Sequence, residues 1–351
     1  MTSRILGSLL MLAPLLVASP LAAQLHPTQP GGIFCRADVD RDLTVDAADL
    51  GALLSDWGGV AYDLDGSGVT DGADIGVFLT QWGDSCHPFH DNVQISIENG
   101  LLVVEASGVP THETGNFPGA CGNPNSVTVQ NGEWMLPIDP EETASPAVDA
   151  MVQQGPIGVM VNGVAFYNPY DGGGITAPDT ICMDLCQAHP SPDGRYHYHQ
   201  HSTCIEPYSG GHSGVVGFAF DGLPVYGPWE SDGQLAAQMS GKRALDACNG
   251  HWDPDRGYHY HSISYDLALE FGVADDGFPW IVGCFKAEPE ASNFAGGGGP
   301  PGGGGGGCPG CAGSMVPPPI CNCVHNTPGY EYCCQNWDAA CASYAASACG
   351  G

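Results

Sequence analysis

Basic residues are scarce in this chain. Its 351 residues include eight Lys and Arg against 39 Asp and Glu, which gives a formal net charge of −31. Proteins hold nucleic acids and anionic membrane surfaces through clusters of positive charge, so this balance argues against both as partners and favours cations as ligands. Long apolar runs are also lacking. A bilayer-spanning helix needs roughly 20 apolar residues in succession, and no segment comes close, so we expect no membrane span.

Recognisable catalytic motifs are missing as well. The sequence has no GxSxG, no HExxH, no phosphate-binding loop and no spaced pair of carboxylates whose chemistry could be named. We therefore leave catalytic residues unassigned and favour a binding or structural role over an enzymatic one.

The N-terminus has the features of an export signal. Arg4 is followed by an apolar run over residues 5–17 and by small residues at Ala22 and Ala23. This order predicts a secretory signal peptide over residues 1–23. We expect an exported protein that is extracellular or at the cell surface.

Cysteine is abundant, with 16 residues in the chain. In an exported protein such a number favours disulfides over reduced thiols. The cysteines fall into three blocks, with two in residues 35–86, six in residues 121–284 and eight in residues 308–349. Because each block holds an even number, each can close its own bridges, and the pairing stays open.

Composition divides the chain into unlike segments. Residues 35–86 are rich in Asp, residues 91–290 form the largest segment, and residues 296–307 are a run of Gly and Pro that predicts a flexible linker. Residues 308–351 predict a small disulfide-rich module. In the large segment, tight-turn dipeptides between apolar runs predict a mainly β domain. These dipeptides are Asn99-Gly100, Asn131-Gly132, Asn162-Gly163 and Asp221-Gly222.

The Asp-rich segment contains a twelve-residue pattern twice, 25 residues apart. Positions 1, 3, 5, 9 and 12 of each copy have oxygen-bearing side chains and position 7 offers a backbone carbonyl, which lets one loop surround a hard cation. The alternative is an acidic surface repeat without ions. The predicted Ca²⁺ ligands of the two sites are Asp38, Asp40, Asp42, Thr44, Asp46 and Asp49, and Asp63, Asp65, Ser67, Val69, Asp71 and Asp74.

An apolar stripe with helical spacing follows each acidic loop, which predicts a small α-helical module. The loops with Asp at position 12 resemble a type I dockerin. That resemblance implies Ca²⁺ binding and a protein or polysaccharide partner at the cell surface, within an assembly that degrades polysaccharide or mediates adhesion. The sequence departs from the family at Ala47-Ala48 and Gly72-Ala73, where hydroxyl-bearing recognition residues are usual, and at Leu43, which replaces the turn glycine.

The large segment contains an internal duplication. Residues 158–169 align with 217–228 at an offset of 59, and residues 184–199 align with 246–261 at an offset of 62. The duplicated halves run over about 156–204 and 215–265, and both contain Tyr-His-Tyr-His close to their C-terminal end. We expect a hairpin, a connection and a His-bearing strand in each half.

Side chains alternate along a strand, so the histidines of Tyr-His-Tyr-His share one face and the tyrosines the other. Imidazoles paired in this way suit a transition metal, with Cu or Zn as candidates. If a pseudo-two-fold axis relates the halves, both His strands can contribute to one paired site. The candidate ligands are His189, His197, His199, His251, His259 and His261. The carboxylates expected to orient them are Asp184, Asp193, Asp246 and Asp255.

A second interpretation treats these histidines as structural residues that are hydrogen-bonded within the fold. Cys186 and Cys248 are alternative ligands, although export favours disulfides for both. His212 has no partner in the repeat and is expected at the surface, while His201 extends the first His array. A metal-dependent enzyme of unassigned reaction is a third interpretation.

The sequences GRYHYH, GFAFDGLPVYGP and GYHYH resemble the YHYH domain family of exported proteins, over residues 91–290. This resemblance implies no particular activity. The CC-x-x-WD-x-x-C core of the tail resembles short Cys-rich modules of secreted planctomycete proteins.

Overall fold

The computed structural model describes residues 35–83, 86–142, 155–172, 175–205, 210–253, 256–273 and 281–294. The predictions for the signal peptide, the Gly/Pro linker, the Cys-rich tail and Asp255 concern residues outside these ranges.

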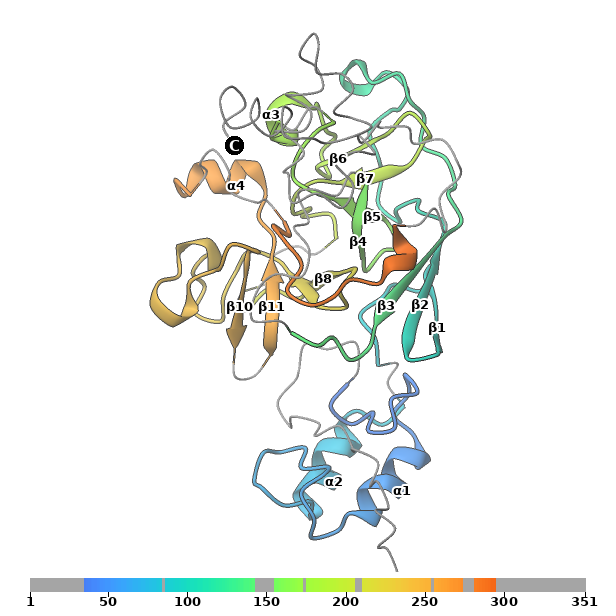
Figure 1. Cartoon of the computed structure of the whole chain (residues 1–351), viewed down its shortest axis with the longest axis vertical. Coiled ribbons are helices and arrows are strands. Elements are labelled where there is room, and N and C mark those ends of the chain that lie inside the picture. The colour runs from blue at the N-terminus through green and yellow to red at the C-terminus, as the bar shows by residue number, and fades with distance from the viewer. Residues whose placement is uncertain are drawn as a thin grey trace, which may run out of the picture.

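Two short helices form the N-terminal part: α1 (Ala47–Ser55) and α2 (Gly72–Thr80). Each begins directly after an acidic loop, because Asp46 and Asp71 cap the helices with their carboxylates and complete capping boxes with Asp49 and Asp74. Figure 1 shows this part in blue at one end of the molecule.

A small core holds the two helices together. Leu53 of α1 and Phe78 of α2, which belong to the predicted apolar stripes, are fully buried in it. The Cys35–Cys86 disulfide joins the ends of the segment. Leu54 and Leu79 of the same stripes remain half exposed or more, at 50% and 60%.

The rest of the described chain is mainly β, as predicted. A three-stranded antiparallel sheet within the described residues has the order β1 (Gln94–Glu98), β2 (Leu101–Ala106), β3 (Gly132–Pro137). Asn99-Gly100 forms the predicted hairpin turn, and both residues have positive φ. Asn131-Gly132, another of the predicted tight turns, does not join two paired strands, because β3 begins at Gly132 and pairs with β2.

The larger sheet has eight strands in the described part of the chain, in the order β10-β11-β9-β8-β4-β5-β7-β6. Its first half contributes β4 (Pro156–Met160), β5 (Ala165–Tyr167), β6 (Ala188–Pro190) and β7 (Tyr196–Tyr198). Its second half contributes β8 (Val215–Ala219), β9 (Pro224–Tyr226), β10 (Gly250–Asp253) and β11 (Gly257–His261).

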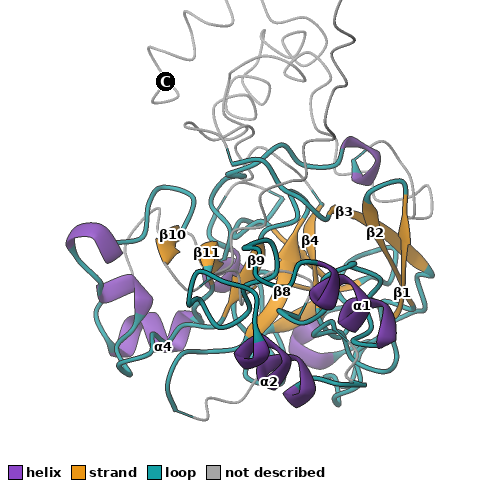
Figure 2. Cartoon of the chain, turned by 90° about the horizontal axis from the view of Figure 1, so that it is seen from below, coloured by secondary structure: helices purple, strands orange, loops and turns teal. Residues whose placement is uncertain are grey.

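The two halves of this sheet have the same internal pairing. A hairpin (β4–β5 or β8–β9) pairs in parallel with the His strand (β7 or β11), which pairs antiparallel with a short edge strand. The central contact is antiparallel, between β4 and β8. Figure 2, seen from the end that carries α1 and α2, shows strands of this sheet behind the two helices.

Glycine is required in the two hairpins of the larger sheet. Gly163 and Gly222 have φ near +81° and +82°, a left-handed conformation that side chains with a Cβ disfavour. Each also lies against the smaller sheet, since an added Cβ would lie 2.5 Å from Ala106 Cβ or 2.2 Å from the Pro137 carbonyl oxygen. The turns therefore fix the sheets against each other.

Short helices complete the described structure: α3 (Ala177–Thr180), α4 (Tyr265–Glu270), and the 3₁₀ turns η1 (Ala120–Gly122), η3 (Ala236–Gln238), η4 (Gly241–Arg243) and η5 (Ala291–Asn293). None of the described helices is long and apolar enough to cross a membrane.

Disulfides close the β region as the even cysteine counts predicted. Cys186 pairs with Cys204 and Cys248 pairs with Cys284. Cys186 and Cys248 are therefore disulfide-bonded and provide no thiolate ligand for a metal.

Candidate metal centres

The His strands present imidazoles on one face and phenols on the other, as the alternation predicts. In β7, the hydroxyl of Tyr196 donates to Asp184 at 2.7 Å, and the Asn162 amide donates to the hydroxyl of Tyr198 at 3.0 Å. In β11, Tyr258 donates to Asp246 at 2.9 Å and Tyr260 donates to Asp221 at 2.5 Å. The phenols thus anchor each strand, which leaves the opposite face to the histidines.

The first histidine group comprises His189, His197 and His199. The Nε2 atoms of His189 and His199 lie 3.3 Å apart, and those of His197 and His199 lie 3.1 Å apart. His189 comes from β6, and the other two come from β7 and the residue that follows it. Tyr167 of β5 stacks on the His197 ring at 3.9 Å between centroids.

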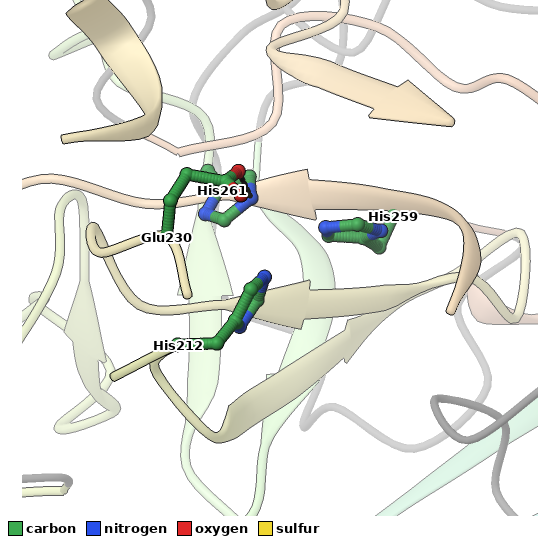
Figure 3. Close-up of side chains that lie close together, drawn as sticks. All are labelled: His212, Glu230, His259 and His261. Carbon is green, nitrogen blue, oxygen red and sulfur yellow. Dashed lines mark ion pairs between the residues drawn. The ribbon is translucent and has the colours of Figure 1, made fainter. Parts of the chain in front are cut away.

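The second histidine group comprises His212, His251, His259 and His261 together with Glu230. The Nε2 atoms of His251 and His259 lie 3.2 Å apart, and Glu230 Oε1 lies 3.1 Å from His251 Nε2 and 3.4 Å from His261 Nε2. His212 precedes β8, and Figure 3 shows the Glu230 carboxylate beside the His261 ring, with the His212 ring on the lower side of the group.

Every imidazole in the two groups is oriented by a backbone carbonyl. The Nδ1 atoms of His197, His199, His212, His251, His259 and His261 lie 2.6–3.1 Å from the carbonyl oxygens of Arg195, Asn168, Ser213, Arg243, Gly257 and Gly227. His189 has a backbone hydrogen bond to Pro190, which lacks an N–H and accepts only through its carbonyl. Since a carbonyl cannot donate, the six rings that have a carbonyl at Nδ1 carry the proton of their neutral form on that atom.

In the neutral form of the rings, Nε2 atoms without a proton consequently face one another in both groups. Two nitrogen lone pairs about 3 Å apart repel unless a proton or a cation lies between them. In the second group, the buried Nε2 of His212 has no hydrogen-bond partner among the described residues, and the buried Nε2 of His261 has only the Glu230 carboxylate nearby, at 3.4 Å. Such atoms are expected to bind a ligand, because a buried polar atom without a partner is costly.

Protons compensate this repulsion poorly in the first group. Burial lowers the pKa of His189 to about 4 and that of His199 to about 3, and it also holds the pKa of His197 well below the usual range. These imidazoles remain neutral near pH 7 and can donate their Nε2 lone pairs to a metal.

The second group differs because it contains a carboxylate. Burial lowers the pKa of His259 to about 2 and that of His212 to about 4. Burial also disfavours the charged form of His251, but the Glu230 carboxylate outweighs it and raises the pKa of that imidazole. Burial acts to raise the pKa of Glu230 as well, yet contacts with His251, His261 and Arg243 hold it far below its usual range.

The spacing of the donor atoms fits a first-row transition metal. Two ligands about 2.0–2.1 Å from a tetrahedral ion lie about 3.3 Å apart, and the Nε2 pairs are separated by 3.1–3.3 Å. The carbonyls on Nδ1 supply the outer contacts that fix the tautomer of metal-binding histidines. The structure therefore contains groups of side chains that could hold a metal.

The expectation of one paired site is wrong. The six predicted histidines belong to two groups, because β7 and β11 are separated by β5, β4, β8 and β9 in the sheet order. His201, which was expected to extend the first group, is not part of it. Its Nδ1 lies 3.1 Å from Ser262 Oγ, and its backbone N–H donates to the Ile263 carbonyl at 3.3 Å. The segments after the two His strands therefore meet.

The predicted orienting carboxylates lie elsewhere. Asp184 and Asp246 accept the hydroxyls of Tyr196 and Tyr258 on the opposite face of the strands, and Asp193 accepts from Ser191 Oγ at 2.5 Å. Backbone carbonyls take the role expected of these residues, either from a residue one or two positions away, as for His197, His212 and His259, or from another segment, as for His199, His251 and His261.

Neither His212 nor Glu230 was predicted from the sequence as a site residue. His212 was expected at the surface, and no role was predicted for Glu230. The signal for Glu230 is present in the repeat, since Asp171 precedes it by the same offset of 59 that relates the hairpins. Both acids follow an aromatic residue that forms an isolated β-bridge, Tyr170 with Thr176 and Trp229 with Leu235. The residue aligned with His212 lies outside the described ranges.

The acidic loops bring together only part of the predicted calcium ligands. Carboxylate oxygens of Asp38, Asp40 and Asp49 gather in the first loop, and those of Asp63, Asp65 and Asp74 in the second. Asp46 and Asp71 cap the helices, Asp42 accepts the Thr44 N–H, and Ser67 Oγ donates to the Val69 carbonyl. Burial is the main cause that raises the pKa of Asp38 to about 6, and Asp49 and Asp42 add to the shift.

One further group has no metal-binding chemistry. His112 lies near Cys186 and Cys204, but these cysteines form a disulfide with each other. His112 Nε2 instead lies 2.6 Å from the Tyr198 hydroxyl.

No curated protein and no solved structure matches this chain. The model of one protein family does match, over residues 133–241, a range that includes the first Tyr-His-Tyr-His and ends before the second. The matching family is described as YHYH protein, and the match supports the resemblance drawn from the repeated tetrapeptide.

Proposed function

We propose that this protein is an exported metal-binding protein whose β domain holds a transition-metal ion in each of the two histidine groups, with Cu or Zn as the candidates. The proposal rests chiefly on one observation: six of the seven imidazoles place Nδ1 against a backbone carbonyl, and within each group Nε2 atoms lie 3.1–3.3 Å apart. A role for these histidines as internal hydrogen-bonding residues would need protons between the facing nitrogens, and burial opposes protonation in the first group.

An internal duplication would explain why there are two groups. The matching strand pairings of the two halves and the constant sequence offsets support a copied unit of hairpin, connection and His strand. Each copy keeps its histidines on one face because its tyrosines are anchored on the other.

Metal retention by the full-length protein tests this proposal. The protein is stripped of metal, incubated with Zn²⁺ or Cu²⁺ and dialysed, and the bound metal is counted by elemental analysis. We expect two equivalents in the wild type and one in each of His197→Ala/His199→Ala and His259→Ala/His261→Ala. His90→Ala, outside both groups, is the matched control. Equal retention by all variants, or none by the wild type, would contradict the proposal.

We further propose that the acidic loops bind Ca²⁺. Support comes from the convergence of three carboxylates in each loop and from the position of a helix directly after each. Asp40→Asn/Asp65→Asn removes one exposed carboxylate from each group, and we expect calorimetry to show weaker Ca²⁺ uptake, with Asp56→Asn as the control. Unchanged uptake in the double variant would argue against these loops as the sites.

A further inference from the structure

The two histidine groups differ in what surrounds them. A cavity of about 710 Å³ lies against the first group and is lined by His189, His197 and His199. This size is within the range of small-molecule sites. A metal held by these histidines would thus have a face that is directed at the cavity.

In the second group, protein side chains would occupy more of the coordination positions of a bound metal. Glu230 adds a carboxylate oxygen at 3.1–3.4 Å from two of the Nε2 atoms, and His212 adds a further imidazole. Arg243 holds the other carboxylate oxygen at 3.0 Å, while its carbonyl accepts from His251 Nδ1. The carboxylate is therefore fixed in place beside the histidines.

Asp171 occupies the position aligned with Glu230, but it does not play the same part. Its side chain is one methylene shorter, and its two oxygens accept from the Ile175 N–H at 2.9 Å and the Thr180 hydroxyl at 2.8 Å. Asp171 lines the cavity all the same. Its charge reaches His199, where it contributes to the pKa.

From these differences we propose that the first metal has an exchangeable coordination position that opens into the cavity and takes a small uncharged ligand, whereas the second metal is closed by protein donors. This inference rests on the proposed metal binding. The ligand is uncharged because, among the described residues, neither Lys nor Arg lines the cavity, while Asp171 and Asp193 do. Three protein ligands with an open position are the arrangement of reactive metal sites, and filled shells are that of structural ones.

A ligand titration of the Cu²⁺-loaded full-length protein tests the open position. The metal is counted first, so that absence of metal, which would overturn both proposals, is distinguished from a fault in this one. Imidazole is then added as an uncharged ligand while the visible and EPR spectra are recorded. We expect one of the two Cu²⁺ ions to respond. His197→Ala/His199→Ala should lose the response, and Glu230→Gln, which opens the second shell, should add a second responding ion.

A second titration tests the preference of the first site for an uncharged ligand over an anionic one. Imidazole-4-acetate presents the same donor ring with an added carboxylate, and we expect it to bind about tenfold more weakly than imidazole, because Asp171 repels it at close range. Asp171→Asn should narrow this difference. A response from both ions or from neither, persistence in His197→Ala/His199→Ala, or equal binding of the two ligands by the wild type would overturn the proposal.

Discussion

The two histidine groups show how the same local pattern yields different sites. Each is built on a strand whose tyrosines are anchored on the reverse face, and each ring is oriented by a carbonyl. They differ through residues outside the tetrapeptide: Glu230 reaches the imidazoles, and Asp171, at the aligned position, is held by Thr180. The second group therefore contains a carboxylate and a further imidazole, His212, beside its strand histidines, whereas the carboxylate of Asp171 is bound to Ile175 and Thr180.

The largest expected difference is in stability. A ligand present at about 1,000 times its Kd adds about 4 kcal/mol to the free energy of unfolding, and a site with more donors should bind more tightly. We expect Zn²⁺ to raise the Tm of His197→Ala/His199→Ala, which keeps the second group, more than that of His259→Ala/His261→Ala. Thermal unfolding with and without metal measures this, since each variant is its own control for the buried side chains removed.

A smaller effect is expected from the carboxylates. Glu230→Gln should weaken metal binding at the second group by about 10–100-fold or more, the loss found even for residues that only support a ligand. Asp171→Asn, the matched change in the first half, should alter the affinity of the first group by less than about threefold. Competition with a chelator gives both affinities. Equal losses would remove the distinction between the groups.

The smallest effect concerns pH. In the first group the pKa values of His189 and His199, about 4 and 3, mean that protons compete with metal only in acid, so its affinity should be level from pH 6 to 8. In the second group Glu230 raises the pKa of His251, and the affinity should still increase as the pH rises through neutrality. Chelator competition at several pH values measures the metal affinity of each group. If the affinities of the two groups changed with pH in the same way, the predicted difference would be absent.

In the metal-free protein, the free energy of unfolding should depend on pH in opposite directions for the two groups. Folding lowers the pKa of the first-group histidines, so their contribution to the free energy of unfolding is lost as the pH falls below about 6.5. Folding raises the pKa of His251, so its contribution is present in acid and lost as the pH rises.

Leu43 illustrates a residue that local rules do not explain. It stands where its counterpart Gly68 has φ of 94°, and it adopts φ of 78° itself. Its side chain packs against the core of the β domain, and Arg41 pairs with Asp139 of that domain. The contact between the two parts compensates for a backbone conformation that a Leu disfavours.

Local rules were sufficient where a pattern acts within one strand, turn or loop. The alternation in Tyr-His-Tyr-His placed the imidazoles and the anchoring phenols on opposite faces, Asn162-Gly163 and Asp221-Gly222 are hairpin turns, and each Asp-rich loop precedes a helix. These features depend on the backbone period and on side chains a few residues apart, which the sequence by itself determined.

Only the tertiary structure decided how these pieces combine. It separated the histidines into two groups, because the hairpins pair at the centre of the sheet and place the His strands outside them. It placed His212 and Glu230, which lie in connections between strands, in the second group. It also made Asp184 and Asp246 hydrogen-bond acceptors for tyrosine hydroxyls rather than for imidazoles. Such contacts depend on strand order and on the side of the sheet that each connection crosses, which no spacing within one segment records.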